Sequence, residues 1–153
     1  MGRVHLAESA AVAAPGGRVY GILADYVAGH PRILPPRYFT RLDVERGGYG
    51  AGTVFSCDMR LLGTSSTFRA EVSEPEPGRV LVERILDERN MVTTFTVDEQ
   101  GPGSCQVTIA TEWPASGLQA LFGRYVAVPA LRRVYRAELA CIGEYAARAA
   151  AGS

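Results

Sequence analysis

The chain has 153 residues, of which 47% are hydrophobic, and its sixteen basic and sixteen acidic residues give a formal net charge of zero. A chain of this length buries roughly 70% of the surface that it exposes when unfolded, which is enough for one complete hydrophobic core. The neutral charge removes any electrostatic basis for binding nucleic acid or an anionic membrane. We therefore expect a single domain over residues 1–153 and no nucleic acid partner.

The cysteines and the N-terminal residues bear on the cellular compartment of the protein. Cys57, Cys105 and Cys141 are far apart and lack the close spacing of a metal or redox motif, so we expect reduced thiols that pack as small hydrophobic residues. A signal-peptide pattern is missing, because Glu8 and the turn at 15–17 interrupt the first apolar residues. No run approaches the roughly 20 apolar residues of a membrane span. These features predict a cytoplasmic protein and leave its oligomeric state open, a homodimer included.

Short elements begin the chain. Residues 3–12 alternate weakly between apolar and polar side chains, which predicts a strand that ends before Pro15. Residues 18–28 have the apolar spacing of an amphipathic helix, and Pro31 and Pro35 close this region. One or two short helices are therefore expected after the first strand.

From Arg37 to Trp113 the apolar pattern has a period close to two. Turn residues divide this stretch into six predicted strands, at residues 37–45, 53–61, 67–74, 79–86, 91–97 and 105–113. Their short connections join antiparallel neighbours, because a parallel crossover needs about a dozen residues or more. Together with the first strand, they predict a seven-stranded antiparallel sheet with one apolar, aromatic face.

The last predicted element is a long helix over residues 116–148. Its apolar residues, Leu118 and Tyr125 among them, recur at three- and four-residue steps and form one broad stripe. Charged residues, including Glu138, fall largely on the other side. Pro129 lacks a backbone donor, so we expect the helix to be kinked or broken there.

A curved sheet crossed by one helix leaves a gap between the two layers. An empty gap of about 500 Å³ would cost about 12 kcal/mol at roughly 24 cal/mol per Å³, which is comparable to the stability of a whole domain. Side chains, water or a ligand must therefore fill it, and a mixture of aromatic, Met and Thr residues suits a small-molecule pocket. The residues predicted to line this pocket are Phe55, Cys57, Met59, Phe68, Met91, Phe95, Ile109, Thr111, Trp113, Phe122 and Tyr125.

Four stretches carry a resemblance to a known superfamily: Leu23-Ala24-Asp25-Tyr26, His30-Pro31-Arg32-Ile33-Leu34-Pro35, Glu71-Val72-Ser73-Glu74-Pro75-Glu76-Pro77-Gly78-Arg79 and Thr93-Thr94-Phe95-Thr96-Val97. With this order of elements, the chain resembles the START/birch-pollen-allergen (SRPBCC) superfamily, and most of all its polyketide cyclase/dehydrase-like branch. The resemblance implies an α+β helix-grip fold, in which a seven-stranded curved antiparallel sheet wraps around a long C-terminal helix, with two short helices after the first strand. It also implies a hydrophobic cavity, which members use for lipid carriage, hormone reception, cyclisation or co-chaperone contacts.

For polyketide cyclases, the resemblance implies an internal Arg or Tyr that polarises a carbonyl or holds an enolate. The candidates here are Arg69, Arg84 and Tyr38. Arg69 lies on the polar side of its predicted strand, whereas Arg84 shares the parity of Val80 and Val82, which would turn it inward.

His30 is placed where a pocket mouth is expected, and its imidazole is suited to act there as an acid or a base. The alternative is a residue at a helix end whose ring bonds a backbone carbonyl. Two His and three scattered Cys show no metal-ligand spacing, so neither a metal nor another cofactor is expected.

Three functions fit these observations. The first, which we favour, is binding or carriage of a small hydrophobic molecule, lipid-like or polyketide-like. The second is a polyketide cyclase, aromatase or dehydratase, which the convergence of two or more ionisable groups inside the cavity would favour, drawn from Arg84, Arg69, His30, Tyr38 and Glu83. The third is a protein-interaction module, which a cavity too small for a ligand would support.

Overall fold

The computed structural model describes residues 2–151, and the side chains of this range up to residue 148. Its elements are, in chain order, β1 (Arg3–Val12), α1 (Gly16–Ala24), α2 (His30–Ile33), β2 (Phe39–Arg46), β3 (Val54–Leu61), β4 (Thr64–Glu76), β5 (Val80–Ile85), β6 (Val92–Gly101), β7 (Ser104–Pro114), α3 (Gly117–Phe122), the π-helical segment η1 (Gly123–Ala127) and α4 (Val128–Ala151).

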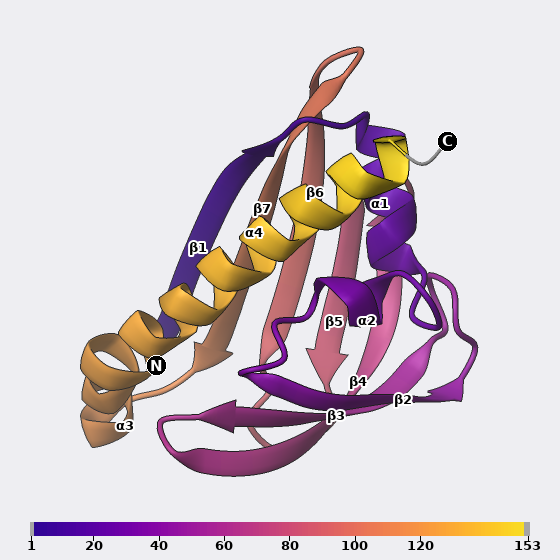
Figure 1. The fold of residues 1–153 in the computed structure, drawn as a ribbon. Helices are drawn as coiled ribbons and strands as arrows, with labels where there is room; N and C mark the ends of the chain where they lie inside the picture. The colour runs from indigo at the N-terminus through magenta and orange to yellow at the C-terminus, as the bar shows by residue number, and fades with distance from the viewer. Residues whose placement is uncertain (1, 152–153) are drawn as a thin grey trace.

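The strands form one seven-stranded sheet in the order β1-β7-β6-β5-β4-β3-β2. Each neighbouring pair is antiparallel. Figure 1 shows the strands curving around α4, with α1 and α2 covering the end of the sheet next to β4 and β5. The predicted helix-grip fold is confirmed, including the two short helices after the first strand.

The inner face of the sheet is set by strand register. Glu83 on β5 lies opposite Thr93 on β6, and Thr93 lies opposite Thr111 on β7. Directly opposite residues of an antiparallel pair point to the same side of the sheet. These three side chains therefore form one row beneath α4, and all three are buried.

The inward parity proposed for Arg84 is wrong. On β5 the buried residues are Leu81, Glu83 and Ile85, whereas Arg84 is exposed. Both faces of this strand carry apolar residues, so alternation alone could not assign them. The register with β6 decides the matter, because Glu83 shares the inner face with Thr93.

The C-terminal helix is kinked next to Pro129, which is one of the two expected outcomes, and it is not broken, since helical residues run without a gap from Gly117 to Ala151. The five residues before α4 are π-helical, and the Val128 N–H donates to the Gly123 carbonyl. Pro129 is the second residue after this π-helical segment, and both a Pro and a π-helical turn are known causes of a helix kink. In Figure 1 the chain turns at this segment, so that α3 does not continue the axis of α4. Within residues 2–151, no helix has the length and apolarity needed to cross a membrane.

Candidate functional site

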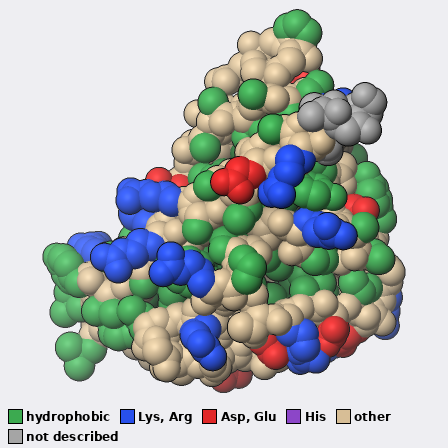
Figure 2. All heavy atoms as spheres, in the orientation of Figure 1, with side chains coloured by type: hydrophobic (Ala, Val, Ile, Leu, Met, Phe, Trp, Pro, Cys, Tyr) green, Lys and Arg blue, Asp and Glu red, His purple; other side chains and the backbone are tan. Residues whose placement is uncertain are grey.

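A cavity of about 690 Å³ lies between the inner face of the sheet and the C-terminal helices. Most of its wall is apolar, and β2, β3, β7 and α3 each contribute two or more apolar residues to it. Its polar lining includes His30, Glu83, Thr93, Tyr135 and Glu138. Figure 2 shows hydrophobic side chains in the hollow between α4 and the rim formed by β2 and β3, and others gathered at α3 beside it.

Eight of the residues predicted to line a ligand pocket do border this cavity: Phe55, Cys57, Met59, Phe68, Met91, Phe95, Trp113 and Phe122. The remaining three, Ile109, Thr111 and Tyr125, are not part of its lining. Ile109 is enclosed in the core, and the Thr111 hydroxyl is hydrogen-bonded to the Tyr135 hydroxyl.

Tyr125 is 69% exposed because it lies in the π-helical segment. Hydrogen bonds from residue i to i+5 change the helical phase, so a stripe extrapolated at 3.6 residues per turn does not continue through this segment. Leu118 and Phe122 just before it reach the edge of the cavity but remain 84% and 57% exposed.

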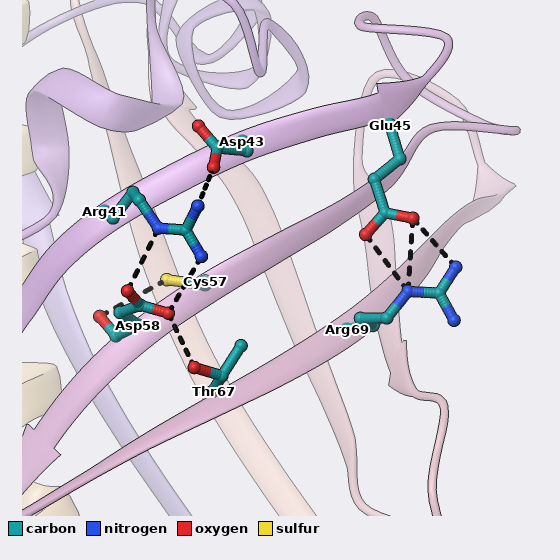
Figure 3. Close-up of polar contacts among 7 residues, drawn as sticks. All are labelled: Arg41, Asp43, Glu45, Cys57, Asp58, Thr67 and Arg69. Atoms are coloured by element: carbon teal, nitrogen blue, oxygen red, sulfur yellow. Dashed lines mark hydrogen bonds and ion pairs between the residues drawn. The ribbon is translucent and has the colours of Figure 1, made fainter.

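The arginine candidates lie outside the cavity. Arg69 is exposed and pairs with Glu45, with its Nη2 2.9 Å from Oε1 of Glu45. Arg41 pairs in the same manner with Asp58 on the adjacent strand. Figure 3 shows both pairs lying along β2, β3 and β4. The Arg69 and Arg84 guanidinium groups therefore do not provide an internal cation.

The other two candidates are placed differently from each other. Tyr38 is partly buried, packs on the edge of the core beneath the Arg37 guanidinium, and does not border the cavity. His30 is only 2% exposed and does border it. Of the four candidates for catalysis, His30 alone is part of the cavity lining.

A tight turn brings His30 to this position. The Asp25 carboxylate accepts hydrogen bonds from the Val27 and Ala28 N–H groups and closes the turn between α1 and α2. Gly29 passes so close to Ile22 that an added Cβ would lie 2.5 Å from the Ile22 carbonyl oxygen. Any side chain at this position would push α2 away from α1, and with it His30.

The His30 ring is held by several contacts. Its Nδ1 lies 2.8 Å from the Leu23 carbonyl oxygen, and because a carbonyl can only accept, Nδ1 carries a proton. The ring stacks on Tyr26 at 4.4 Å between centroids and meets the edge of Phe95 at 5.6 Å. Its Nε2 is left facing Glu83 Oε2 at 3.6 Å. His30 therefore bonds a carbonyl, as the alternative hypothesis held, and also borders the cavity.

Glu83 is the centre of the buried polar cluster. The Tyr26 hydroxyl donates to Glu83 Oε2 at 2.6 Å, on the same oxygen that faces His30. Burial raises the pKa of Glu83, while the charge of His30 and the hydrogen bond from Tyr26 act to lower it. Glu83 thus has partners that stabilise its ionised form inside an apolar cavity.

Glu138 is a second buried carboxyl, on α4, and it lacks such partners. It is 3% exposed and borders the cavity. Among the described residues, none makes a hydrogen bond to its Oε2. Burial, followed by the negative charge of Glu83, raises the pKa of Glu138 well above its usual range. The two carboxyls therefore have unequal environments, because Glu83 has partners that oppose the effect of burial on its pKa and Glu138 has none among the described residues.

The expectation that Glu138 lies on the outer side of the helix is wrong. It follows the buried Val134 by four residues and precedes the buried Ile142 by four, so all three lie on one face of α4. The spacing of four residues from Val134 and Ile142 indicates that Glu138 is buried. A position on the solvent side was expected because charged residues are rarely buried.

Comparison with known proteins identifies the family that has this architecture. Residues 3–146 match the model of the family described as polyketide cyclase / dehydrase and lipid transport. A search of curated proteins found no match.

Three solved structures share the fold. The NMR structure of KanY protein is 26% identical with a TM-score of 0.80, over 95% of this chain and 99% of that one. Zhui aromatase/cyclase from Streptomyces sp. R1128 is 21% identical with a TM-score of 0.80, over 96% and 95% of the two chains. Norcoclaurine synthase from Thalictrum flavum is 15% identical with a TM-score of 0.74, over 96% of each chain. Given the match along nearly its whole length, this chain belongs to the polyketide cyclase / dehydrase and lipid transport family.

Proposed function

We propose that this chain binds a small, mostly hydrophobic molecule in the cavity beneath α4. The observation that carries the proposal is a cavity of about 690 Å³ whose wall is largely apolar and whose buried polar residues include Glu83 and Glu138. A ligand would lay its apolar body against Met59 and Phe68 and direct a polar group toward the two carboxyls. A cavity of this volume does not support the third hypothesis, a module with a collapsed interior.

We also propose that residues 1–153 form one ligand-binding domain of a cytoplasmic protein. The first strand and the last helix are in contact, because the Arg132 side chain on α4 donates a hydrogen bond to the Ala7 carbonyl on β1 at 3.0 Å. The free thiols of Cys57, Cys105 and Cys141 suit a reducing compartment.

A bulky substitution in the cavity tests binding. We expect Met59→Trp to weaken binding of a naphthalene probe such as 2-acetylnaphthalene by about tenfold or more, since Met59 borders the cavity and the larger ring occupies ligand volume. Arg60→Trp is the matched control, because Arg60 is the next residue on β3 and is exposed. Isothermal titration calorimetry measures both affinities. If both substitutions weaken binding equally, or if neither weakens it, the probe binds outside this cavity.

Native mass spectrometry of the purified protein, before and after denaturation, detects any molecule that it carries.

A second candidate function is cyclisation or dehydration of a polyketide-like substrate. It is favoured by the convergence of two ionisable groups, Glu83 and His30, within the cavity. Such convergence of ionisable groups distinguishes a catalyst from a plain carrier. The structural likeness to an aromatase/cyclase is compatible with this chemistry.

The chemistry needs no cofactor. The Glu83 carboxylate would remove a proton from a carbon next to a carbonyl, and the resulting enolate carbon would attack a second carbonyl of the same chain. One C–C bond forms, and the oxygen of the attacked carbonyl takes up a proton to become a hydroxyl. Loss of that hydroxyl with a neighbouring C–H proton, as water, leaves a C=C bond. Tyr26 and His30 hold the base in place through contacts with one oxygen of Glu83.

A further inference from the structure

Glu138 is a buried carboxyl of the cavity, and its Oε2 is, among the described residues, the one fully buried side-chain oxygen or nitrogen that has no hydrogen-bond partner. The other polar groups around it are already engaged. Tyr26 donates to Glu83, and His30 is bonded to the Leu23 carbonyl. Tyr135 is hydrogen-bonded to Thr111. Buried polar atoms in native proteins nearly always have partners, so the Glu138 carboxyl is the buried group of the cavity wall that is left for a ligand to satisfy.

We propose that Glu138 donates a hydrogen bond to a carbonyl oxygen of the ligand, and that the cavity selects neutral ketones over carboxylates and ammonium ions. The inference rests on the proposed binding function and adds the chemical class of the ligand. It is carried by the burial of Glu138, by its unpartnered oxygen and by its position on the cavity wall.

The charges around the cavity explain why Glu138 acts as a donor. Burial and the nearby charge of Glu83 both oppose ionisation of Glu138. Of the two possible cations in the lining, His30 faces Glu83, and Arg89 is paired with Asp87. An uncharged carboxylic acid has one O–H to donate, and a carbonyl oxygen accepts it.

The same charges select against ionised ligands. A carboxylate would bring a second negative charge next to Glu83 with no free cation to meet it among the described lining residues. An ammonium ion would lose its hydration shell without an ionised Glu138 to replace it. A neutral ketone avoids both penalties.

Four ligands built on one ring system test this selectivity by calorimetry at neutral pH. They are 2-acetylnaphthalene, 2-ethylnaphthalene, 2-naphthoate and 1-(2-naphthyl)ethylamine, which present a ketone, an apolar group of similar shape, a carboxylate and an ammonium ion. We expect the ketone to bind the protein about tenfold more tightly than the ethyl compound. The two charged ligands should bind more weakly than the ethyl compound.

Variants of Glu138 then identify the group responsible. Glu138→Gln should keep the preference for the ketone, because the amide N–H also donates, whereas Glu138→Leu should make the ketone and the ethyl compound bind equally. Glu144→Leu is the control, since Glu144 is exposed on the same helix. Circular dichroism verifies that each variant is folded.

The outcomes separate this inference from the function on which it rests. The role of Glu138 is refuted if the ketone binds no more tightly than the ethyl compound, or if Glu138→Leu still binds the ketone more tightly. In either case the proposed binding function is unaffected. Tightest binding of the carboxylate or the ammonium ion also refutes it. If none of the four ligands binds, the proposed binding function fails, and this inference fails with it.

Discussion

Replacement of Glu83 by Gln is expected to slow proton transfer from a bound ketone by about 10²- to 10⁴-fold, the usual contribution of a general base. The readout is deuterium exchange into the methyl group of 2-acetylnaphthalene in D₂O, followed by mass spectrometry. In the native protein, the Glu83 carboxylate removes a methyl proton to give the enolate, and a deuteron is returned to the same carbon. Gln has nearly the same shape but cannot take up the proton.

The pH dependence of this exchange follows from the surroundings of Glu83. Burial raises its pKa above the ordinary value of about 4.3. Only the ionised form acts as a base, so the rate should fall as the pH is lowered through this raised pKa. A profile whose acid limb lies above the ordinary range of a carboxyl group would indicate that a buried carboxyl is the base, and loss of the activity in Glu83→Gln would assign that role to Glu83 and not to Glu138.

Two controls make the Glu83 result specific. Calorimetry should show that Glu83→Gln still binds the ketone, so that the loss lies in proton transfer. Arg69→Gln should exchange at the native rate, because Arg69 is exposed and paired with Glu45 outside the cavity. If the native protein does not exceed the buffer rate, the chain is a binder or carrier. If Glu83→Gln matches the native rate, another group is the base.

Replacement of Glu138 by Gln is expected to stabilise the protein at neutral pH and to flatten the dependence of its stability on pH. The pKa of Glu138 is raised in the folded state, so the folded protein keeps this proton above about pH 4.3 while the unfolded chain releases it. The free energy of unfolding then falls as the pH rises. The slope is about 1.4 kcal/mol per pH unit until the folded group also ionises.

The native protein should therefore lose stability steadily as the pH rises above about 5, for as long as the folded Glu138 keeps its proton. Glu138→Gln removes the titrating group and so should lose less stability over that range. Urea unfolding at several pH values measures both curves, and Glu144→Gln is the exposed control on the same helix. Any slope left in Glu138→Gln reports other titrating groups, the buried Glu83 among them. Parallel curves for the native protein and Glu138→Gln would mean that Glu138 is ionised in the folded state.

Much of the architecture was predictable from the chain itself. The strand over residues 3–12 is found as β1, and each of the six strands predicted between residues 37 and 113 has a counterpart within a few residues of the predicted bounds. Alternation on β3 and β6 also identified the side of the sheet that carries Phe55 and Phe95. These predictions succeed because strand periodicity is local, and because Gly and Pro mark turns by their own backbone preferences.

Side-chain direction was harder to predict where both faces of an element look alike. On β5, Val80 and Val82 alternate with Leu81 and Ile85, so hydrophobicity alone could not tell whether Arg84 or Glu83 turns inward. Tyr125 was misplaced for a related reason, because the π-helical segment changes the helical phase without a warning in the apolar pattern.

The amino-acid sequence by itself determined the order of the elements, the apolar face of the sheet and the family to which the chain belongs. Only the tertiary structure decided which ionisable groups share the cavity. Glu83, Tyr26, His30 and Glu138 come from distant segments of the chain, and strand register and helix packing bring them together. An ionisable residue that is buried departs from the rule that charged side chains face solvent, and the sequence around it does not reveal this. Its burial becomes apparent only from the residues that pack around it, which lie far away in the sequence.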